Sequence, residues 1–284
     1  MKASYHTLLV LLFIALCFSA DAQSIDSLTK RKKSLDSIMS SEHLEMLTGT
    51  TPIHYSANFQ VRAKTLQGLF VNCINYYEYI FPGTKFNVNI YILGKADWDK
   101  PHTGFPYGMP FYHPDYQVLF VPAEKNALRR LTGLPDDPIK SDSVLSSFDF
   151  QPIHELGHYY FFTLNSIYKE RWMNEFLATY FLICFIQAKN LAPDLQKELQ
   201  ANFPVAHRTL DEFEKLYLGV GPANYHWYQS KFAMLGYSLY PQFKEKLITL
   251  VLQNYAPGGK NLDAESFLLS ISPDKLTAWL NEMK

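Results

Sequence analysis

The stretch that most constrains this chain runs from Gln151 to Phe162 and reads QPIHELGHYYFF. It contains an H-E-x-x-H pattern, in which His154 and His158 lie four positions apart. On an α-helix this spacing places both imidazole rings on one face, one turn apart, where they can bind a single zinc ion. Glu155 then lies beside the metal, where it can accept a proton from a water molecule. The pattern therefore predicts a helix that carries a metal site.

The residues around the pattern favour such a helix. Asp149 can cap its N-terminus, and Pro152 falls in the first turn, where a missing N–H does no harm. Gly157 costs helix stability, about 1 kcal/mol relative to alanine. A glycine at this position leaves room either for close packing or for a substrate.

Two histidines do not complete a catalytic zinc site, which usually has three protein ligands and one open position. The extended H-E-x-x-H-x-x-G-x-x-H pattern fails, because Phe161 and Leu164 occupy the glycine and third-histidine places. The alternative is a glutamate on the next helix. Glu175 lies 17 positions after His158 and fits that role.

Simple helix geometry lets Glu175 return to the level of His158. If the first helix ends near Leu164 and the second begins near Lys169, each arm has about six residues. At a rise of ~1.5 Å per residue, the chain descends about 9 Å and returns about 9 Å. The Asn165–Ser166 pair is typical of the turn that is needed between the two arms.

At this point the sequence resembles a known group. HELGH followed by WMNEFLATY (Trp172–Tyr180) resembles the gluzincin metallopeptidases, and the order of elements from about Ile53 to Tyr240 is similar to small bacterial peptidase MA-like domains. The resemblance implies a zincin-like fold, one zinc ion per chain and Glu155 as general base. The zinc ligands that it implies are His154, His158 and Glu175.

The chain departs from the aminopeptidase branch of that group in two ways. The spacing from His158 to Glu175 is slightly shorter, and no GxMEN-type exopeptidase segment is found. The Gly108–Phe111 segment occupies roughly that region instead. The choice between an endopeptidase and an exopeptidase therefore stays open.

Hydrolysis also needs a group that stabilises the oxyanion, and other groups should orient the ligands. The segment YHWYQS offers Tyr228 as the favoured donor, with Tyr225 or His226 as alternatives, although aromatic residues at a helix start are equally typical of packing. Asn174 and Thr179 flank Glu175 and are candidates to orient it, or else capping or surface residues.

The rest of the chain predicts an α+β fold. A helix is expected over Val61–Phe81, an aromatic loop over Asp97–Pro114, and a mainly helical half from Ser143 onward. The predicted strands are Ile53–Ala57, Lys85–Leu93 and Gln117–Pro122. The strand Gln117–Pro122 is either an ordinary sheet strand or an edge strand that pairs with an extended peptide.

The N-terminus reads as a targeting segment. Leu8–Phe18 is a short apolar run after a positive charge, and Ala20–Ala22 supplies the small residues of a cleavage site. We expect a signal peptide over 1–22, a helical leader over 23–50, and a zincin-like domain over 51–284. Within that domain, the β-containing part extends to about 140 and the helical part covers 141–284. This organisation predicts export, periplasmic or secreted, with no membrane anchor after cleavage; an uncleaved anchor is the alternative.

The charge of the chain bears on its partners, and its cysteines bear on disulfide formation. The formal net charge is −1, with 26 basic and 27 acidic residues, so nothing points to nucleic acid. Cys73 and Cys184 can pair in an oxidising compartment, but their apolar surroundings fit buried free thiols equally well. The leading hypothesis is an exported zinc-dependent hydrolase, a peptidase acting on peptides or proteins. The alternative is a non-catalytic zinc-containing binding or scaffold protein on the same fold.

Overall fold

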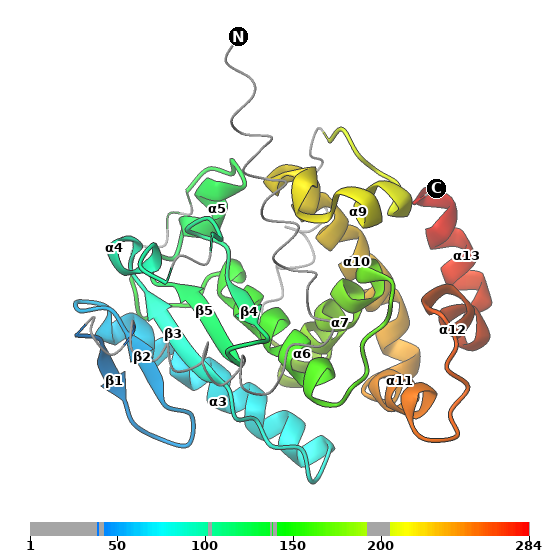
Figure 1. Ribbon diagram of the computed structural model, residues 1–284, viewed down its shortest axis with the longest axis horizontal. Helices are drawn as coiled ribbons and strands as arrows, with labels where there is room; N and C mark the ends of the chain where they lie inside the picture. The colour runs from blue at the N-terminus through cyan, green and yellow to red at the C-terminus, as the bar shows by residue number, and fades with distance from the viewer. Residues whose placement is uncertain are drawn as a thin grey trace.

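The computed structural model describes residues 39, 43–101, 104–136, 138, 141–191 and 205–283. The predicted signal peptide, 1–22, and most of the predicted leader, 23–50, lie outside these residues. Within the described part, a five-stranded sheet and α3 form one side of the molecule, and helices form the other (Figure 1). None of the described helices combines the length and the apolar character that a membrane span requires.

The sheet is mixed and has the strand order β1-β2-β3-β5-β4. Its three inner strands run parallel, and the two edge strands pair antiparallel with their neighbours. The strands are β1 (Glu45–Leu47), β2 (Ile53–Tyr55), β3 (Asn89–Leu93), β4 (Phe111–His113) and β5 (Val118–Pro122).

Two details of the sheet correct the sequence analysis, and a third decides between two alternatives that it left open. β1 falls inside the leader, 23–50, which was expected to be helical. β4 falls inside the segment Asp97–Pro114, which was expected to be a loop. The sequence did not predict this strand because three residues are too few to give an alternating pattern. β5, predicted over Gln117–Pro122, lies between β3 and β4, so it is an interior strand and β4 forms the edge.

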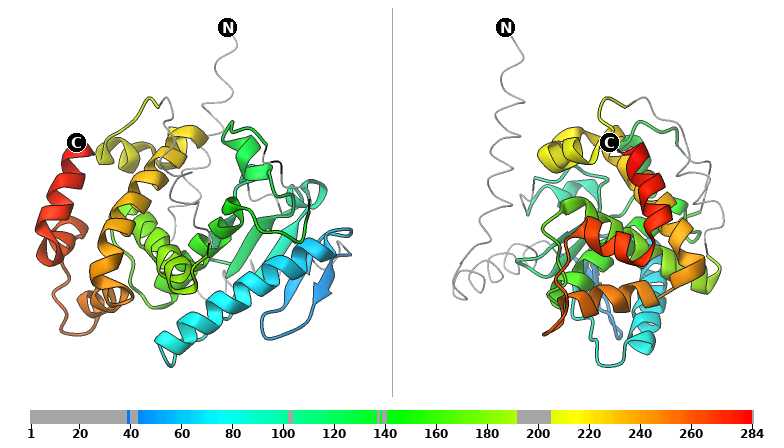
Figure 2. Two further views of the ribbon diagram at one scale, coloured as in Figure 1. Left: turned by 180° about the vertical axis from the view of Figure 1, so that it is seen from behind. Right: turned by 90° about the vertical axis from the view of Figure 1, so that its right-hand side faces the viewer.

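The sheet is covered on both faces, since alternate residues of its strands join two different apolar clusters. Ile90 and Ile92 of β3 face the larger cluster, which includes the apolar residues of α3 (Gln60–Ile80). Tyr91 and Leu93 belong to the smaller cluster on the opposite face. The view from behind shows α3 crossing the back of the sheet (Figure 2).

From residue 141 onward the described chain contains helices and connecting segments, so the predicted α+β architecture is confirmed. The larger apolar cluster also includes side chains of the last helix, and it therefore joins the sheet to the helical part. The remaining elements are α4 (Lys95–Trp98), α5 (Ala127–Leu131), the 3-10 helix η1 (Ser147–Phe150), α6 (Gln151–Thr163), α7 (Arg171–Lys189), α9 (Leu210–Leu216), the 3-10 helix η2 (Tyr217–Val220), α10 (Pro222–Phe243), α11 (Lys246–Tyr255), α12 (Ala264–Ile271) and α13 (Pro273–Glu282).

Cys73 of α3 and Cys184 of α7 are buried free thiols. Burial raises the pKa of both thiols well above the usual value, so both stay protonated. They act as small apolar residues in the larger cluster.

Candidate metal centre

The helix that carries HELGH begins differently from the sequence expectation. α6 starts at Gln151 and has Pro152 in its first turn, as predicted, but Asp149 belongs to the preceding η1. Asp149 forms a buried ion pair with Arg62 of α3, and its Oδ2 accepts a hydrogen bond of 2.6 Å from Ser146 N. Asp149 therefore holds η1, the element before α6, against α3. The prediction that Asp149 caps α6 was wrong.

The connection between α6 and α7 matches the predicted turn. α6 ends at Thr163 and α7 begins at Arg171. Asn165 adopts a left-handed φ of 50°, and Ser166 N donates a hydrogen bond of 3.0 Å to Phe161 O. Such a pattern closes a helix C-terminus and reverses the chain.

Gly157 is the point of close approach between α6 and α7. A Cβ atom at this position would lie 2.9 Å from Ala178 Cα and 3.1 Å from Ala178 O. Of the two roles that the sequence left open for Gly157, the structure shows close packing. The absence of a side chain lets the two helices approach until their polar residues meet.

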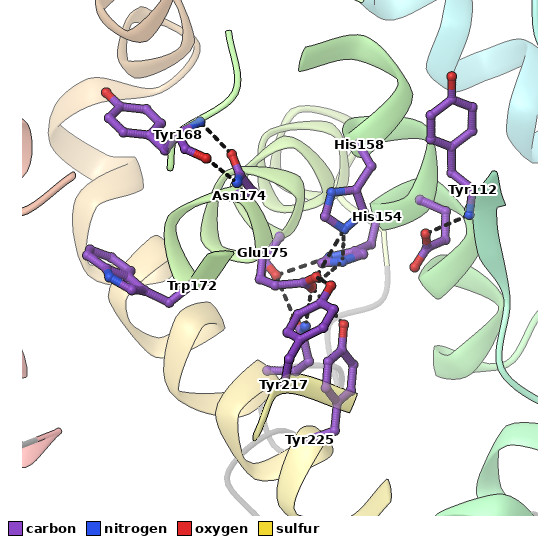
Figure 3. A network of polar contacts seen from close by, with 12 residues as sticks. Tyr112, His154, His158, Tyr168, Trp172, Asn174, Glu175, Tyr217 and Tyr225 are labelled. Atoms are coloured by element: carbon purple, nitrogen blue, oxygen red, sulfur yellow. Dashed lines mark hydrogen bonds and ion pairs between the residues drawn. The ribbon is translucent and has the colours of Figure 1, made fainter. Parts of the chain in front are cut away.

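These two helices bring His154, His158 and Glu175 together, as Figure 3 shows. His154 Nε2 lies 3.1 Å from His158 Nε2 and 3.2 Å from Glu175 Oε2. His158 Nε2 lies 3.5 Å from Glu175 Oε1. His154 and Glu175 are buried, whereas 23% of the His158 side chain is exposed.

The cluster holds opposite charges at close range. Burial alone would raise the pKa of Glu175, but the charge of His158 and the contacts with both histidines hold that pKa well below its usual range. Burial alone would lower the pKa of His158, yet the charge and hydrogen bond of Glu175 raise it to about 9. A cation that binds here must therefore displace a proton from His158.

Three further side chains donate hydrogen bonds to Glu175. Tyr217 donates to Oε1 at 2.5 Å, Tyr225 donates to Oε2 at 2.7 Å, and Gln229 Nε2 donates to Oε2 at 2.6 Å. Burial, followed by the charge of Glu175, raises the pKa of both tyrosines well above the usual value, so both hydroxyls stay protonated. Tyr225 was an alternative in the sequence analysis, whereas Tyr217 and Gln229 carried no motif that could have marked them.

Glu155 follows His154 on α6 and faces the edge strand. Its Oε2 accepts a hydrogen bond of 2.9 Å from Tyr112 N of β4. Burial raises the pKa of Glu155, and the neighbouring His158 and His154 only partly offset this effect. Glu155 is thus a half-buried carboxyl group with raised proton affinity, as a general base requires.

The residues predicted to orient the ligands divide into two kinds. Thr179 Oγ1 lies 3.1 Å from His154 Nδ1, so it contacts a predicted ligand. Asn174 instead binds the backbone of Tyr168 on both its N–H and its carbonyl side, at 2.8 Å each (Figure 3). The Asn174 side chain therefore points away from the cluster and holds the loop that leads into α7.

The structure also corrects the choice of Tyr228 as the oxyanion donor. The Tyr228 side chain is fully buried, and its hydroxyl donates a hydrogen bond of 2.8 Å to Thr209 O. Tyr228 lies on the side of α10 that packs against Phe213 of α9. Because successive tyrosines of α10 point in different directions, Tyr225 reaches the cluster and Tyr228 does not.

A cavity of about 520 Å³ opens beside the cluster. His154, Glu155 and Tyr225 form part of its wall, so the histidine, the carboxyl group and the tyrosine all face the same space. His226 also lines the cavity, and burial lowers its pKa to about 4. Much of the remaining wall is apolar, including Phe105, Pro106, Met109, Pro110, Leu128 and Leu131.

The donor atoms fit a divalent metal. Two imidazole nitrogens and one carboxylate oxygen, all within 4.8 Å of one another, form a group that could hold a metal ion. Comparisons with protein-family models, curated proteins and solved structures find no match for this chain.

Proposed function

We propose that this protein is an exported zinc-dependent hydrolase, and that it acts as a peptidase. The observation that carries the proposal is that the His154, His158 and Glu175 cluster adjoins Glu155 at the wall of one cavity. The cluster offers three ligands, and the cavity gives a substrate access to the side of the cluster. A purely structural zinc site commonly has four protein ligands and no use for a carboxyl group beside it.

The role that we propose for each residue follows from its chemistry. His154, His158 and Glu175 would hold the metal, which when bound would act as a Lewis acid that polarises the carbonyl group and makes water more acidic. Glu155 accepts the proton of the attacking water and delivers it to the leaving amine. The raised pKa of Glu155 favours that acceptance.

We assign oxyanion stabilisation to Tyr225. Its hydroxyl is protonated, lies at the cluster and lines the cavity, which are the properties that such a donor needs. Tyr217 also bonds Glu175 and lines the cavity, but it has a φ of 43° at the junction between α9 and the short helix η2. Tyr225 lies within the regular helix α10, which fixes its position more firmly.

Two features support a peptide as the substrate. Among the described strands β4 pairs with β5 alone, so its other edge, where Tyr112 N bonds Glu155, can hydrogen-bond an extended chain that replaces this contact. The apolar part of the cavity wall can receive an apolar side chain of that peptide. Export by the predicted signal peptide, residues 1–22, remains part of the proposal.

The test is a comparison of Glu155→Gln with the wild type in a peptide-library cleavage assay, alongside metal analysis. We expect the variant to keep zinc and to lose roughly 10²–10⁴-fold in turnover, because it lacks the base but keeps all three ligands. Glu265→Gln, the same change on the exposed surface of α12, should leave turnover unchanged. Full activity of Glu155→Gln would refute the mechanism, and zinc binding without any cleavage by the wild type would favour a scaffold.

A further inference from the structure

A chain of hydrogen bonds joins two of the three proposed ligands through α10. Gln229 Nε2 donates to Glu175 Oε2 at 2.6 Å, and Gln229 Oε1 accepts from Thr179 Oγ1 at 3.0 Å. Thr179 Oγ1 lies in turn 3.1 Å from His154 Nδ1. All four side chains are buried, so water does not compete for these bonds.

The direction of every bond in this chain follows from its first member. A carboxylate has no hydrogen to donate, so the amide nitrogen of Gln229 faces Glu175 and its oxygen faces Thr179. The threonine hydroxyl has one hydrogen, which it donates to that oxygen. Thr179 Oγ1 can then only accept from His154, and the hydrogen of the neutral His154 ring therefore lies on Nδ1.

That tautomer is the one a metal needs. With the hydrogen on Nδ1, the lone pair of His154 lies on Nε2, which points at His158 and Glu175. If Gln229 could not accept from Thr179, the hydroxyl would be free to donate to His154 Nδ1. The ring hydrogen would then move to Nε2 and occupy the position of the metal.

The geometry points to Gln229 as a positioning residue, which fixes the tautomer of His154 and the orientation of Glu175 through one amide group. This inference rests on the metal centre proposed above. It gives α10 a role beyond Tyr225, since one residue of that helix sets two ligands on two other helices. Such outer contacts typically contribute about 10–100-fold to metal affinity.

Three variants test this chain of hydrogen bonds. Gln229→Met keeps the length of the side chain but removes both the donor and the acceptor. Thr179→Val keeps the shape but removes the hydroxyl, and Thr179→Ser restores it. Asn254→Leu is the control, because it also removes a buried amide. Asn254 lies on α11 and bonds Tyr168, in the connection before α7, and Leu262, in the loop after α11.

The first readout is the His154 tautomer in the metal-free protein, from long-range ¹H–¹⁵N spectra with ¹⁵N-labelled histidine and His154→Gln to assign the signals. We expect the hydrogen on Nδ1 in the wild type, Thr179→Ser and Asn254→Leu. We expect it to shift towards Nε2 in Gln229→Met and Thr179→Val. A wild-type ring with its hydrogen on Nε2, or an unchanged tautomer in both disrupting variants, overturns the inference.

The second readout is zinc affinity from competition with a chelator. Gln229→Met and Thr179→Val should each bind zinc about 10–100-fold more weakly, with Thr179→Ser close to the wild type. Equal affinity in all variants would overturn the positioning role. A wild-type protein that shows the expected tautomer but binds no zinc would instead refute the proposed metal centre, so the two failures are distinguishable. If Gln229→Met does not fold, the comparison of Thr179→Val with Thr179→Ser still tests the inference.

Discussion

His154 Nε2 and Glu175 Oε2 lie 3.2 Å apart in the protein interior, although 21 positions separate the two residues and they belong to different helices. The contact exists because α6 and α7 approach each other at Gly157 and Ala178. The proposed metal centre therefore depends on a packing feature that contributes no ligand. That dependence can be tested without altering any polar group.

Gly157→Ala should push α6 away from α7, because its new Cβ would meet the backbone of Ala178 at 2.9 Å. Helix propensity alone would favour alanine by about 1 kcal/mol, but overpacking typically costs 1–3 kcal/mol, roughly enough to reverse the sign. We expect lower stability of the metal-free protein in urea and about tenfold weaker zinc binding, since the ligands move apart.

Gly68→Ala is the matched control for that prediction. Gly68 is exposed on α3, and no atom lies within 4 Å of the Cβ that would be added. The same substitution should therefore stabilise the protein by up to about 1 kcal/mol and leave zinc affinity unchanged. If Gly157→Ala behaved like Gly68→Ala, close packing at Gly157 would not be what positions the ligands.

Tyr225→Phe should lower kcat by about 10²–10³-fold with little change in KM, because the hydroxyl acts on charge that develops in the transition state. Tyr228→Phe should leave kcat unchanged and cost about 1 kcal/mol of stability, since it loses only the bond to Thr209 O. Steady-state kinetics on a cleaved peptide separate the two. A large kcat loss in Tyr228→Phe with normal kinetics in Tyr225→Phe would restore the expectation from the sequence.

Zinc binding should release a proton at neutral pH. His158 has a pKa of about 9 in the metal-free protein, so its ring is charged at pH 7.5, and it must lose that proton to become a ligand. Apparent zinc affinity should consequently rise with pH up to about 9 and then level off. Calorimetry in two buffers with different ionisation enthalpies should give close to one proton released at pH 7.5.

The same residue provides a check in the absence of metal. A raised pKa means that protonated His158 stabilises the folded state fully below pH 6.5, and that this contribution is lost as pH rises through about 9. Urea unfolding of the metal-free protein should show stability falling across that window, and His158→Gln should flatten the curve. A stability that rises over this range would contradict the assigned contact with Glu175.

The convergence of His154, His158 and Glu175 could be predicted from sequence because each part rests on local rules. His154 and His158 are one helical turn apart, and the Asn165–Ser166 turn fixes how far the chain travels before Glu175. These features depend on helix geometry and turn chemistry alone. The α+β architecture likewise followed from local periodicity.

The parts that sequence could not predict depend on tertiary packing. β4 is a three-residue edge strand whose pairing with β5 decides its structure. Tyr225 and Tyr228 differ by less than one helical turn, and only the packing of α10 decides which hydroxyl reaches Glu175. Gln229 and Tyr217 become visible as partners of Glu175 only when α7, α9 and α10 are assembled.

The central claim is that His154, His158 and Glu175 hold one zinc ion. Its most direct test is anomalous diffraction across the zinc absorption edge, on crystals of protein purified without chelator. We predict a single strong peak about 2.0–2.2 Å from His154 Nε2, His158 Nε2 and one Glu175 oxygen. A map with no peak at these three side chains, from protein supplied with zinc, would contradict the account.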